Sequence, residues 1–248
     1  MIICKSAPEI AKLRRSGRLV RKILEATRDR VRPGVTTLEL EKFAEKKVAE
    51  AGALSAFKGY RGYPCVLCTS VNSEIVHGIP SNRRLLEGDI VSLDLGVVVD
   101  GYYGDSALTV PVGEISEATQ QLLRVTEEAL DLAIDKVRLG NRLGDISAAV
   151  QAHVEANGFS VVREMVGHGI GRQLHEEPQV PNFGQPGHGP VLKEGMVLAI
   201  EPMVNSGTHE LRILEDHWTA VTADGGNSAH FEHMVAVTRN GPDVLTRI

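Results

Sequence analysis

Two aspartates occupy unexpected positions in the segment SLDLGVVVDGYYGDSA, which spans residues 92–107. Asp94 lies among leucines and valines that are typical of a half-buried strand, and Asp105 follows a Gly-Tyr-Tyr-Gly stretch. A buried carboxylate without a partner costs several kcal/mol. Both aspartates are therefore expected to face a compensating positive charge.

The dipeptide Asp100-Gly101 between these aspartates is typical of a two-residue β-hairpin. With the turn at this point, Asp94 lies opposite Ala107, and Asp105 lies two residues along on the same face of the hairpin. Diagonal neighbours on one face are about 7–8 Å apart, so the two carboxylates would repel each other. A hard divalent metal cation between them is the simplest compensation.

Further oxygen and nitrogen ligands follow later in the chain. Glu201 ends the apolar run MVLAI, Glu232 interrupts the strand-like HFEHMVAVT, and His168 lies in the glycine-rich GHGIG. Four acids and one histidine are too many ligands for one structural zinc ion, which favours four nitrogen or sulfur ligands. They suit two metal ions about 3.5–4 Å apart, bridged by carboxylates and a water or hydroxide.

Four other histidines lie near these segments. His77 in VHGIP and His175 in LHEEPQV occupy loop-like stretches, where a lone histidine is more often structural. His230 and His233 flank Glu232, and only His230 would share its strand face. Both are expected to support the ligands or to have a structural role.

The order of the expected elements repeats along the chain. A helix after the capping box of Ser6 and Glu9, and a second helix after Thr36, precede strand-like segments at about residues 65–112. From residue 116 the order restarts. A helix that ends near residue 140 and a shorter one over residues 145–158 precede further strand-like segments.

Sequence echoes support an internal duplication. Residues 31–52 resemble residues 137–158 at an offset of 106. Residues 87–94 resemble residues 194–201 at an offset of 107. The second pair matches Asp94 with Glu201, and stacking the halves about a pseudo-twofold axis would bring both acids into one cleft. Because no Pro/Gly/Ser-rich linker divides the halves, we expect one compact domain of residues 1–248, with halves at about 1–112 and 113–248.

Composition indicates a globular protein outside the membrane. Apolar residues make up 42% and charged residues 24% of the 248 residues. The longest strictly apolar run is too short for a membrane span, and the N-terminal segment lacks the apolar region of a secretory signal. Three cysteines cannot form a disulfide framework, and Cys65 and Cys68 are expected to be structural or to line a pocket. The cytoplasm is the expected compartment.

The net charge of −5 is unevenly distributed. Residues 1–32 contain ten Lys/Arg and three Asp/Glu, so this segment carries +7 and the rest of the chain −12. A basic helix of this kind usually presents a solvated face.

Six motifs resemble, in order, those of the type I methionine aminopeptidases: GYRGYP, VHGIP, LDLG followed by GD, GHGIG followed by LHEEP, EPM and FEH. The resemblance extends over nearly the whole chain, and the motifs are specific. It implies an α/β (α+β) pita-bread fold. In this fold, two pseudo-twofold-related helix–helix–sheet halves surround a curved antiparallel sheet, with the helices on its outer side.

The resemblance also implies two divalent metal cations per chain. Asp105 and Glu232 would bridge the metals, Asp94 would bind one of them, and the other would be bound by His168 and Glu201. Carboxylates and one imidazole accept Co, Mn, Fe or Zn, so the identity of the metal stays open.

The activity that the resemblance implies is removal of the initiator methionine from nascent proteins and peptides. A metal-bound hydroxide would attack the first peptide bond, and Glu201 would pass the proton to the departing amine. His77 and His175 would hydrogen-bond the scissile amide and the developing oxyanion. The methionine side chain would enter a pocket formed by Tyr60, Tyr63, Cys68, Leu174 and Trp218, with Phe57 as a less clearly aligned candidate.

The expected partners follow from this activity. They are peptides and nascent chains with an N-terminal methionine, and the protein is expected to be a monomer without a membrane contact. The basic segment 1–32 is a candidate contact with the negatively charged ribosome, where long-range attraction raises encounter rates.

Two residues depart from the family pattern. Leu174 stands where an aromatic residue often precedes the His of HEEP, and His217 stands where a glycine commonly precedes Trp218. Both departures bear on the shape of the methionine pocket.

Three alternatives remain. A pita-bread peptidase of the aminopeptidase P or prolidase type usually carries an additional N-terminal domain, for which this chain has no room. A non-catalytic pita-bread binding protein is disfavoured by the intact ligands and histidines. A dinuclear phosphoesterase is disfavoured because no segment looks like a dedicated phosphate clamp.

Overall fold

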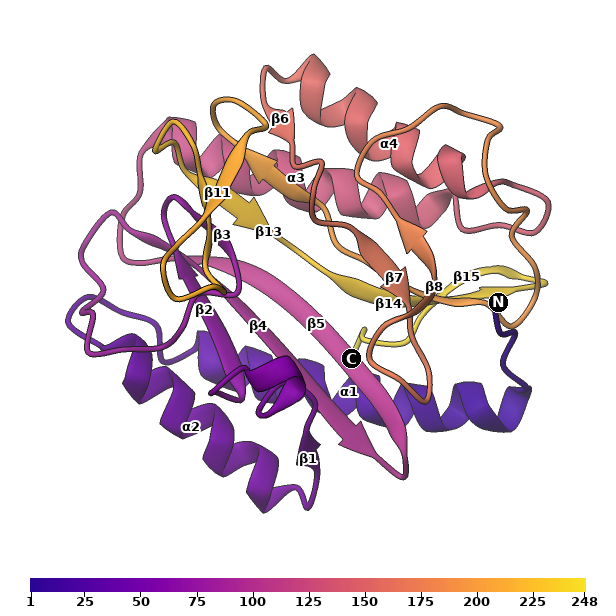
Figure 1. The fold of residues 1–248 in the computed structure, drawn as a ribbon, viewed down its shortest axis with the longest axis horizontal. Helices are drawn as coiled ribbons and strands as arrows, with labels where there is room; N and C mark the ends of the chain where they lie inside the picture. Colours follow the sequence, from indigo (N-terminus) through magenta and orange to yellow (C-terminus); the bar gives the residue numbers. More distant parts are fainter.

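Two successive sets of helices and strands make up the chain, and this computed structural model describes all residues 1–248 (Figure 1). The first set contains α1 (Ala7–Arg28), α2 (Thr37–Glu50), β1 (Leu54–Ser55), the 3-10 helix η1 (Tyr60–Gly62), β2 (Leu67–Val71), β3 (Glu74–Val76), β4 (Ile90–Val99) and β5 (Tyr102–Pro111). The second set contains α3 (Glu117–Asp135), α4 (Leu143–Ala156), β6 (Ser160–Val161), β7 (Gly167–Gly169), β8 (Glu176–Val180), β9 (Val197–Ile200), β10 (Met203–Asn205), β11 (Leu211–Ile213), β12 (Ala220–Thr222), β13 (Ser228–His230), β14 (His233–Thr238) and β15 (Gly241–Val244).

Capping side chains fix the starts of the first two helices. The carboxylate of Glu9 accepts the N–H of Ser6 at 2.9 Å, as the capping box before α1 predicts. At α2 the exchange is reciprocal, because Glu39 accepts the N–H of Thr36 at 2.7 Å and the Thr36 hydroxyl accepts the N–H of Glu39 at 3.2 Å. Both predicted helix starts are confirmed.

The fourth helix begins earlier than the sequence predicts. Asp145 was expected at its start, but α4 begins at Leu143. The Asp145 carboxylate accepts the N–H of Arg142 at 2.7 Å, which is the bond that a third helical residue makes back to the N-cap. Asp145 is therefore a capping residue inside the first turn.

The hairpin that carries the two aspartates is confirmed. Strands β4 and β5 pair in antiparallel fashion, with Asp94 directly opposite Ala107. Asp100 and Gly101 form the turn with φ angles of 52° and 76°. Positive φ at both turn residues is the conformation that Asp-Gly favours in a tight hairpin. Asp105 therefore lies two residues from the point opposite Asp94, on the same face.

Two larger antiparallel sheets contain the central strands of the two sets. In the first, β5 pairs with β4 along its whole length, and β2 and β1 pair with successive parts of the other edge of β4. In the second, the order is β15-β14-β9-β7-β8. Two smaller sheets have the orders β13-β10-β6 and β11-β12-β3. The strand pair β3–β12 links the two halves of the chain.

The halves also meet where β5 runs beside the segment that leads into β14. Across this β5–β14 junction, the N–H of Glu232 donates to the carbonyl of Ala107 at 3.0 Å, and the Ser106 hydroxyl donates to the carbonyl of Glu232 at 3.0 Å. The Thr109 hydroxyl donates to the carbonyl of His230 at 2.9 Å. These polar contacts fix the position of Glu232 relative to the β4–β5 hairpin.

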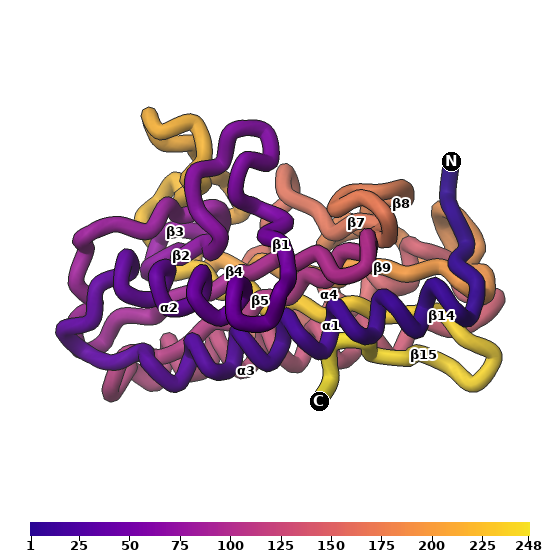
Figure 2. The backbone as a smooth tube through the Cα atoms, turned by 90° about the horizontal axis from the view of Figure 1, so that it is seen from below, coloured from indigo at the N-terminus to yellow at the C-terminus, as the bar shows by residue number.

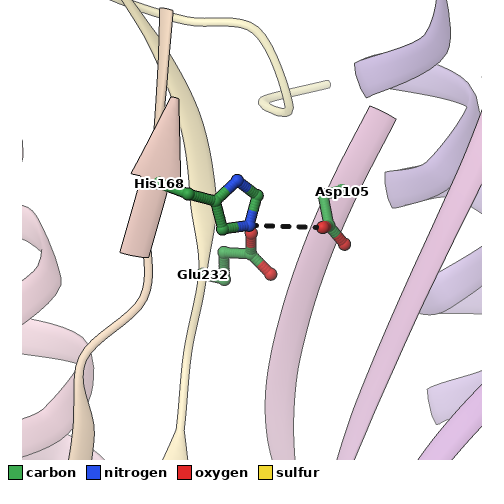
Figure 3. Close-up of side chains that lie close together, drawn as sticks. All are labelled: Asp105, His168 and Glu232. Atoms are coloured by element: carbon green, nitrogen blue, oxygen red, sulfur yellow. Dashed lines mark ion pairs between the residues drawn. The ribbon is translucent and has the colours of Figure 1, made fainter. Parts of the chain in front are cut away.

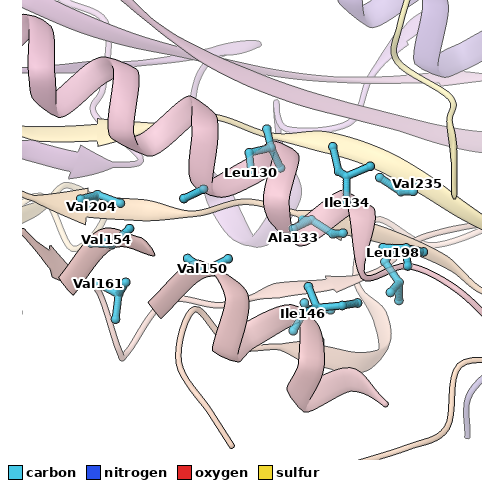
Figure 4. Packing of buried hydrophobic residues seen from close by; sticks show 14 of the residues in the cluster. Leu130, Ala133, Ile134, Ile146, Val150, Val154, Val161, Leu198, Val204 and Val235 are labelled. Carbon is cyan, nitrogen blue, oxygen red and sulfur yellow. The ribbon is translucent and has the colours of Figure 1, made fainter. Parts of the chain in front are cut away.

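Each half has an apolar core of its own. Seventeen buried residues, mainly from α1, α2, β2, β4 and β5, form one cluster. Twenty-two buried residues, mainly from α3, α4, β9, β10 and β14, form the other (Figure 4). Figure 4 shows Leu130 and Ile134 of α3, Val150 of α4, and Leu198 and Val235 of the sheet within it. At about 25 cal/mol per Å² of buried apolar surface, clusters of this size anchor the strands firmly.

The helices and the loop-bearing strands lie on different sides of the sheet layer. Figure 2 shows α1, α2 and α3 along one side, whereas β3, β7 and β8 rise on the other. This arrangement leaves the second side free to form a site. None of the helices has the length and apolar content that crossing a membrane requires.

A buried ion pair ties the N-terminal arm, residues 1–6, to β8. Lys5 Nζ lies 2.7 Å from Glu176 Oε2, and the two side chains are 5% and 8% exposed. The other oxygen of Glu176 accepts the N–H groups of Arg172 and Gln173 at 2.8 and 3.1 Å. The carboxylate therefore holds both the arm and the turn that leads into β8.

Replacing Lys5 by methionine should destabilise the protein strongly, because it leaves the Glu176 carboxylate buried without a cation. We expect Lys5→Met to lower the free energy of unfolding by about 3–5 kcal/mol in urea titrations. The double variant Lys5→Met/Glu176→Gln should recover much of this loss. The control is Lys46→Met, because Lys46 pairs with Glu50 at 3.8 Å with side chains 71% and 47% exposed. It should cost less than about 1 kcal/mol. Equal losses in the two single variants would contradict the role given to the buried pair.

Candidate metal centre and active site

The five predicted ligands come from five segments and line one cavity of about 190 Å³, here called the site cavity. Asp94 and Asp105 come from β4 and β5 of the first half. His168 lies on β7, Glu201 directly follows β9, and Glu232 directly precedes β14, all in the second half. The cavity is therefore built from both halves.

Three of these residues form the tightest group. Asp105, His168 and Glu232 are buried, and each offers a ligand atom within 4.8 Å of the others (Figure 3). His168 Nε2 lies 3.9 Å from Asp105 Oδ2 and 3.5 Å from Glu201 Oε1. In Figure 3 the imidazole of His168 points between the two carboxylates that face it.

The carboxylates lack the compensation that burial requires. One oxygen each of Asp94, Asp105 and Glu232 is buried without any hydrogen-bond partner. Removal from water raises the pKa of all four site carboxyls, and for Asp105 and Glu232 the neighbouring carboxylates raise it further. Burial also lowers the pKa of His168 to about 3, so its ring is neutral, which is the form that binds metals. This set of hard oxygens and one neutral nitrogen fits divalent metal cations.

His77 and His175 line the same cavity from two different loops. Removal from water lowers the pKa of His77 to about 4. Its φ of 62° lies in the left-handed region, where a residue other than glycine carries a backbone strain of about 1–3 kcal/mol. Such strain is typical of functional positions. The ring meets that of Trp218 edge to face, with the centroids 6.2 Å apart.

The ring of His175 is oriented by a hydrogen bond. Its Nδ1 lies 2.8 Å from the hydroxyl of Tyr60. Its centroid is 4.3 Å from that of His168, so it stands directly beside a predicted ligand. Partial burial, and then the charge of Arg61, lower the pKa of His175. The ring is therefore neutral near pH 7 and can donate one N–H to a substrate.

All the residues predicted for the side-chain pocket line the site cavity: Tyr60, Tyr63, Cys68, Leu174 and Trp218, together with Phe57. Tyr63 and Trp218 pack edge to face with their centroids 5.1 Å apart. The Tyr63 hydroxyl donates to the carbonyls of Leu67 and Gly78, at 3.1 and 3.0 Å, which fixes the ring. The apolar wall is thus rigid on one side of the carboxylates.

Sequence reasoning missed Arg61, which also lines the site cavity. Its position between two pocket tyrosines in GYRGYP was the available signal.

The two histidines beside Glu232 differ in position. His230 is 1% exposed and places Nε2 3.6 Å from Glu201 Oε2, whereas His233 Nδ1 bonds the Thr246 hydroxyl at 2.8 Å, away from the cavity.

The two departures from the family pattern have different structural settings. His217 has a φ of 63°, a conformation that costs a glycine nothing and strains other residues. Leu174 is 3% exposed and belongs to the cavity wall. Only the second departure changes the lining of the pocket.

Comparisons with known proteins identify the family of this chain. The model of metallopeptidase family M24 matches residues 11–239. Methionine aminopeptidases of Clostridium perfringens and Bacillus subtilis are 52% and 51% identical to the chain, with complete coverage of both sequences in each case. The crystal structure of the Thermotoga maritima methionine aminopeptidase has a TM-score of 0.98 at 47% identity, and the match covers both chains completely.

More distant relatives share the fold alone. The prolidase of Pyrococcus furiosus has a TM-score of 0.78 at 22% identity, and the match covers 66% of its longer chain. The pita-bread fold expected from the sequence is therefore confirmed, and the prolidase alternative is not favoured. The family match, the full-length relatives and the geometry of the site lead to one conclusion: the chain belongs to metallopeptidase family M24 and, within it, to the methionine aminopeptidases.

Proposed function

We propose that this protein removes the N-terminal methionine from peptides and nascent chains, with two divalent metal cations bound in the site cavity. The main support for this proposal is that five ligand side chains, two further histidines and an apolar wall line one cavity. The names of its full-length relatives support the reaction and its substrate class.

Asp105 and Glu232 are the proposed bridging ligands. Asp105 lies on β5 and Glu232 directly before β14, on the two sides of the β5–β14 junction, and each has a buried oxygen without a partner. Asp94 would bind one metal, and the other would be held by His168 and Glu201, whose nearest atoms are 3.5 Å apart. Divalent metals held by these residues would supply an activated water and a Lewis acid for the carbonyl oxygen.

The remaining steps belong to side chains of the protein. Glu201 lies between His168 and His230 in the site cavity, at 3.5 and 3.6 Å, and this carboxylate is placed to accept a proton from the attacking water and release it to the departing amine. His77 and His175 are neutral near pH 7 and donate N–H groups to the scissile amide and the developing oxyanion. The apolar wall holds the methionine side chain, which leaves the first peptide bond next to these groups.

Removal of a bridging carboxylate should abolish binding of both metals. We expect Asp105→Ala and Glu232→Ala to lose most bound metal by elemental analysis, and Asp94→Ala to lose about one equivalent. Metal-stripped wild-type protein, supplied with each candidate metal in turn, should recover cleavage of Met-Ala-Ser. Matched controls are His77→Ala and His175→Ala. These should keep their metal while turnover falls about 100- to 1,000-fold, the usual loss for one oxyanion donor. A full metal complement in Asp105→Ala would contradict the bridging role.

The pocket should favour a long unbranched side chain over a branched one. Tyr63 and Trp218 form a fixed wall, and Cys68 offers a polarisable contact to a thioether. We expect kcat/KM for Met-Ala-Ser to exceed that for Leu-Ala-Ser and Ala-Ala-Ser by at least about tenfold. Leu174→Phe, which narrows the cavity, should raise this ratio further. Similar rates for the Met and Leu peptides would refute the narrow pocket but not the peptidase activity.

We also propose that the protein works as a monomer in the cytoplasm and meets nascent chains at the ribosome through α1. Lys12, Arg18 and Lys22 are exposed on this helix and have no acidic partner within 4.0 Å, whereas Arg14, Arg15, Arg21 and Arg28 pair with acids of the chain. Changing these three unpaired residues to glutamate should weaken co-sedimentation with ribosomes at low salt, without altering peptide cleavage. Unchanged co-sedimentation would show that the face is merely solvated.

A further inference from the structure

A second cavity of about 670 Å³, here called the outer cavity, lies beside the site cavity. Arg61, His168 and His175 line both cavities, so the two are continuous at the predicted metal centre. The inference rests on the proposed function. If the methionine side chain fills the site cavity, the residues after the first peptide bond must pass into the adjoining space.

The charged groups of the outer cavity are mostly engaged within the protein. Glu176 is paired with Lys5 at 2.7 Å. Arg172 lies 3.8 Å from Glu9, and its guanidinium lies over the ring of Tyr102, 4.7 Å from the centroid. Arg61 is the one arginine of this cavity without a carboxylate within 4.0 Å, and the only other cation that lacks one is the N-terminal ammonium of Met1.

The backbone fixes the position from which the Arg61 side chain extends. Arg61 lies in the single turn η1 with a φ of 49°, and the N–H of Tyr63 donates to the carbonyl of Tyr60 at 2.9 Å across it. The side chain of Tyr60 is bonded to His175, and its ring lies 5.4 Å from the Arg61 guanidinium. A strained turn held on both sides is typical of a position with a binding role.

Glu177 is the acid of the outer cavity that has no ion pair within the protein. Glu177 lines only the outer cavity, whereas Arg61 lines both. An extended peptide advances about 3.3–3.6 Å per residue, so the third substrate residue follows the first by about 7 Å. The second residue carries the amide nitrogen of the bond that breaks, so the third is the first residue that can lie wholly beyond that bond. It is assigned to Arg61, which lines both cavities, and a later residue to Glu177.

We propose that Arg61 binds a carboxylate on the third residue of the substrate and makes the enzyme prefer Asp or Glu at that position. The planar guanidinium can donate two parallel hydrogen bonds to a carboxylate. Because Arg61 is exposed, the preference is moderate and salt-dependent. We expect kcat/KM to be about three- to tenfold higher for an acidic than for a basic third residue at low salt.

The test compares amidated peptides, which lack a terminal carboxylate, with metal-loaded full-length enzyme. Met-Ala-Asp-Ser, Met-Ala-Asn-Ser and Met-Ala-Lys-Ser should rank in that order by kcat/KM, with the difference mainly in KM. Arg61→Gln should bring the three peptides to similar values, Arg61→Glu should reverse the order, and high salt should compress it. The neutral Asn peptide is the internal reference for intact chemistry.

Two matched variants separate Arg61 from general charge effects. Arg124→Glu on α3 changes the net charge equally but lies outside both cavities, and it should keep the wild-type order. Glu177→Gln should also keep the preference at the third residue. Equal kcat/KM for the Asp and Lys peptides in the wild type, or an order that survives Arg61→Glu, would overturn the inference and leave the peptidase intact. Failure to release methionine from any peptide would instead refute the proposed function, and this inference with it.

Discussion

Mutual repulsion among four buried carboxylates is the constraint on which the rest of this structure depends. Burial raises the pKa of Asp94, Asp105, Glu201 and Glu232, and three of them keep an oxygen without a hydrogen-bond partner. Carboxyls in this state need added protons or cations, so they do not hold one another in place. Their positions must therefore be fixed by strands whose own stability comes from elsewhere.

That stability comes from the two apolar cores. The ten-residue strands β4 and β5 carry Asp94 and Asp105 over the first core, and β9 and β14 lead to Glu201 and Glu232 over the second. Strands held in this way keep the acids together, and the histidines are added from less regular segments. A hydrogen bond to Tyr60 orients the ring of His175. The position of His77 depends instead on a strained, left-handed backbone conformation. The acids are thus positioned by regular strands, whereas each histidine in the same cavity is oriented by contacts of its own.

Local signals in the sequence predicted much of this arrangement. Asp100-Gly101 predicted the hairpin and the register of Asp94, because a two-residue turn leaves the strands no other pairing. Capping boxes predicted the starts of α1 and α2, and acids in apolar runs indicated a metal site. These features depend on residues that are close in sequence or on one conspicuous charge. The internal duplication remains a prediction.

Features that depend on distant contacts could not be predicted. The pairing of β3 with β12 and the buried contact between Lys5 and Glu176 join residues more than a hundred positions apart. Arg61 was missed because an arginine in the glycine-containing stretch GYRGYP looks like an ordinary loop residue. The start of α4 was misplaced because Asp145 caps from inside the first turn, whereas an aspartate at a helix start more often is the N-cap.

The division of the ligand set between the two halves has a consequence for assembly of the protein. Asp94 and Asp105 belong to the first half, whereas His168, Glu201 and Glu232 belong to the second. A cation bound by both groups would act as a further cross-link between halves that already share the polar contacts of the β5–β14 junction and a buried apolar cluster of twelve residues. Because such a ligand binds only the docked arrangement, its binding free energy adds to the cohesion of the halves. Metal supply would then govern how long the folded enzyme survives proteolysis, as well as whether it turns over substrate.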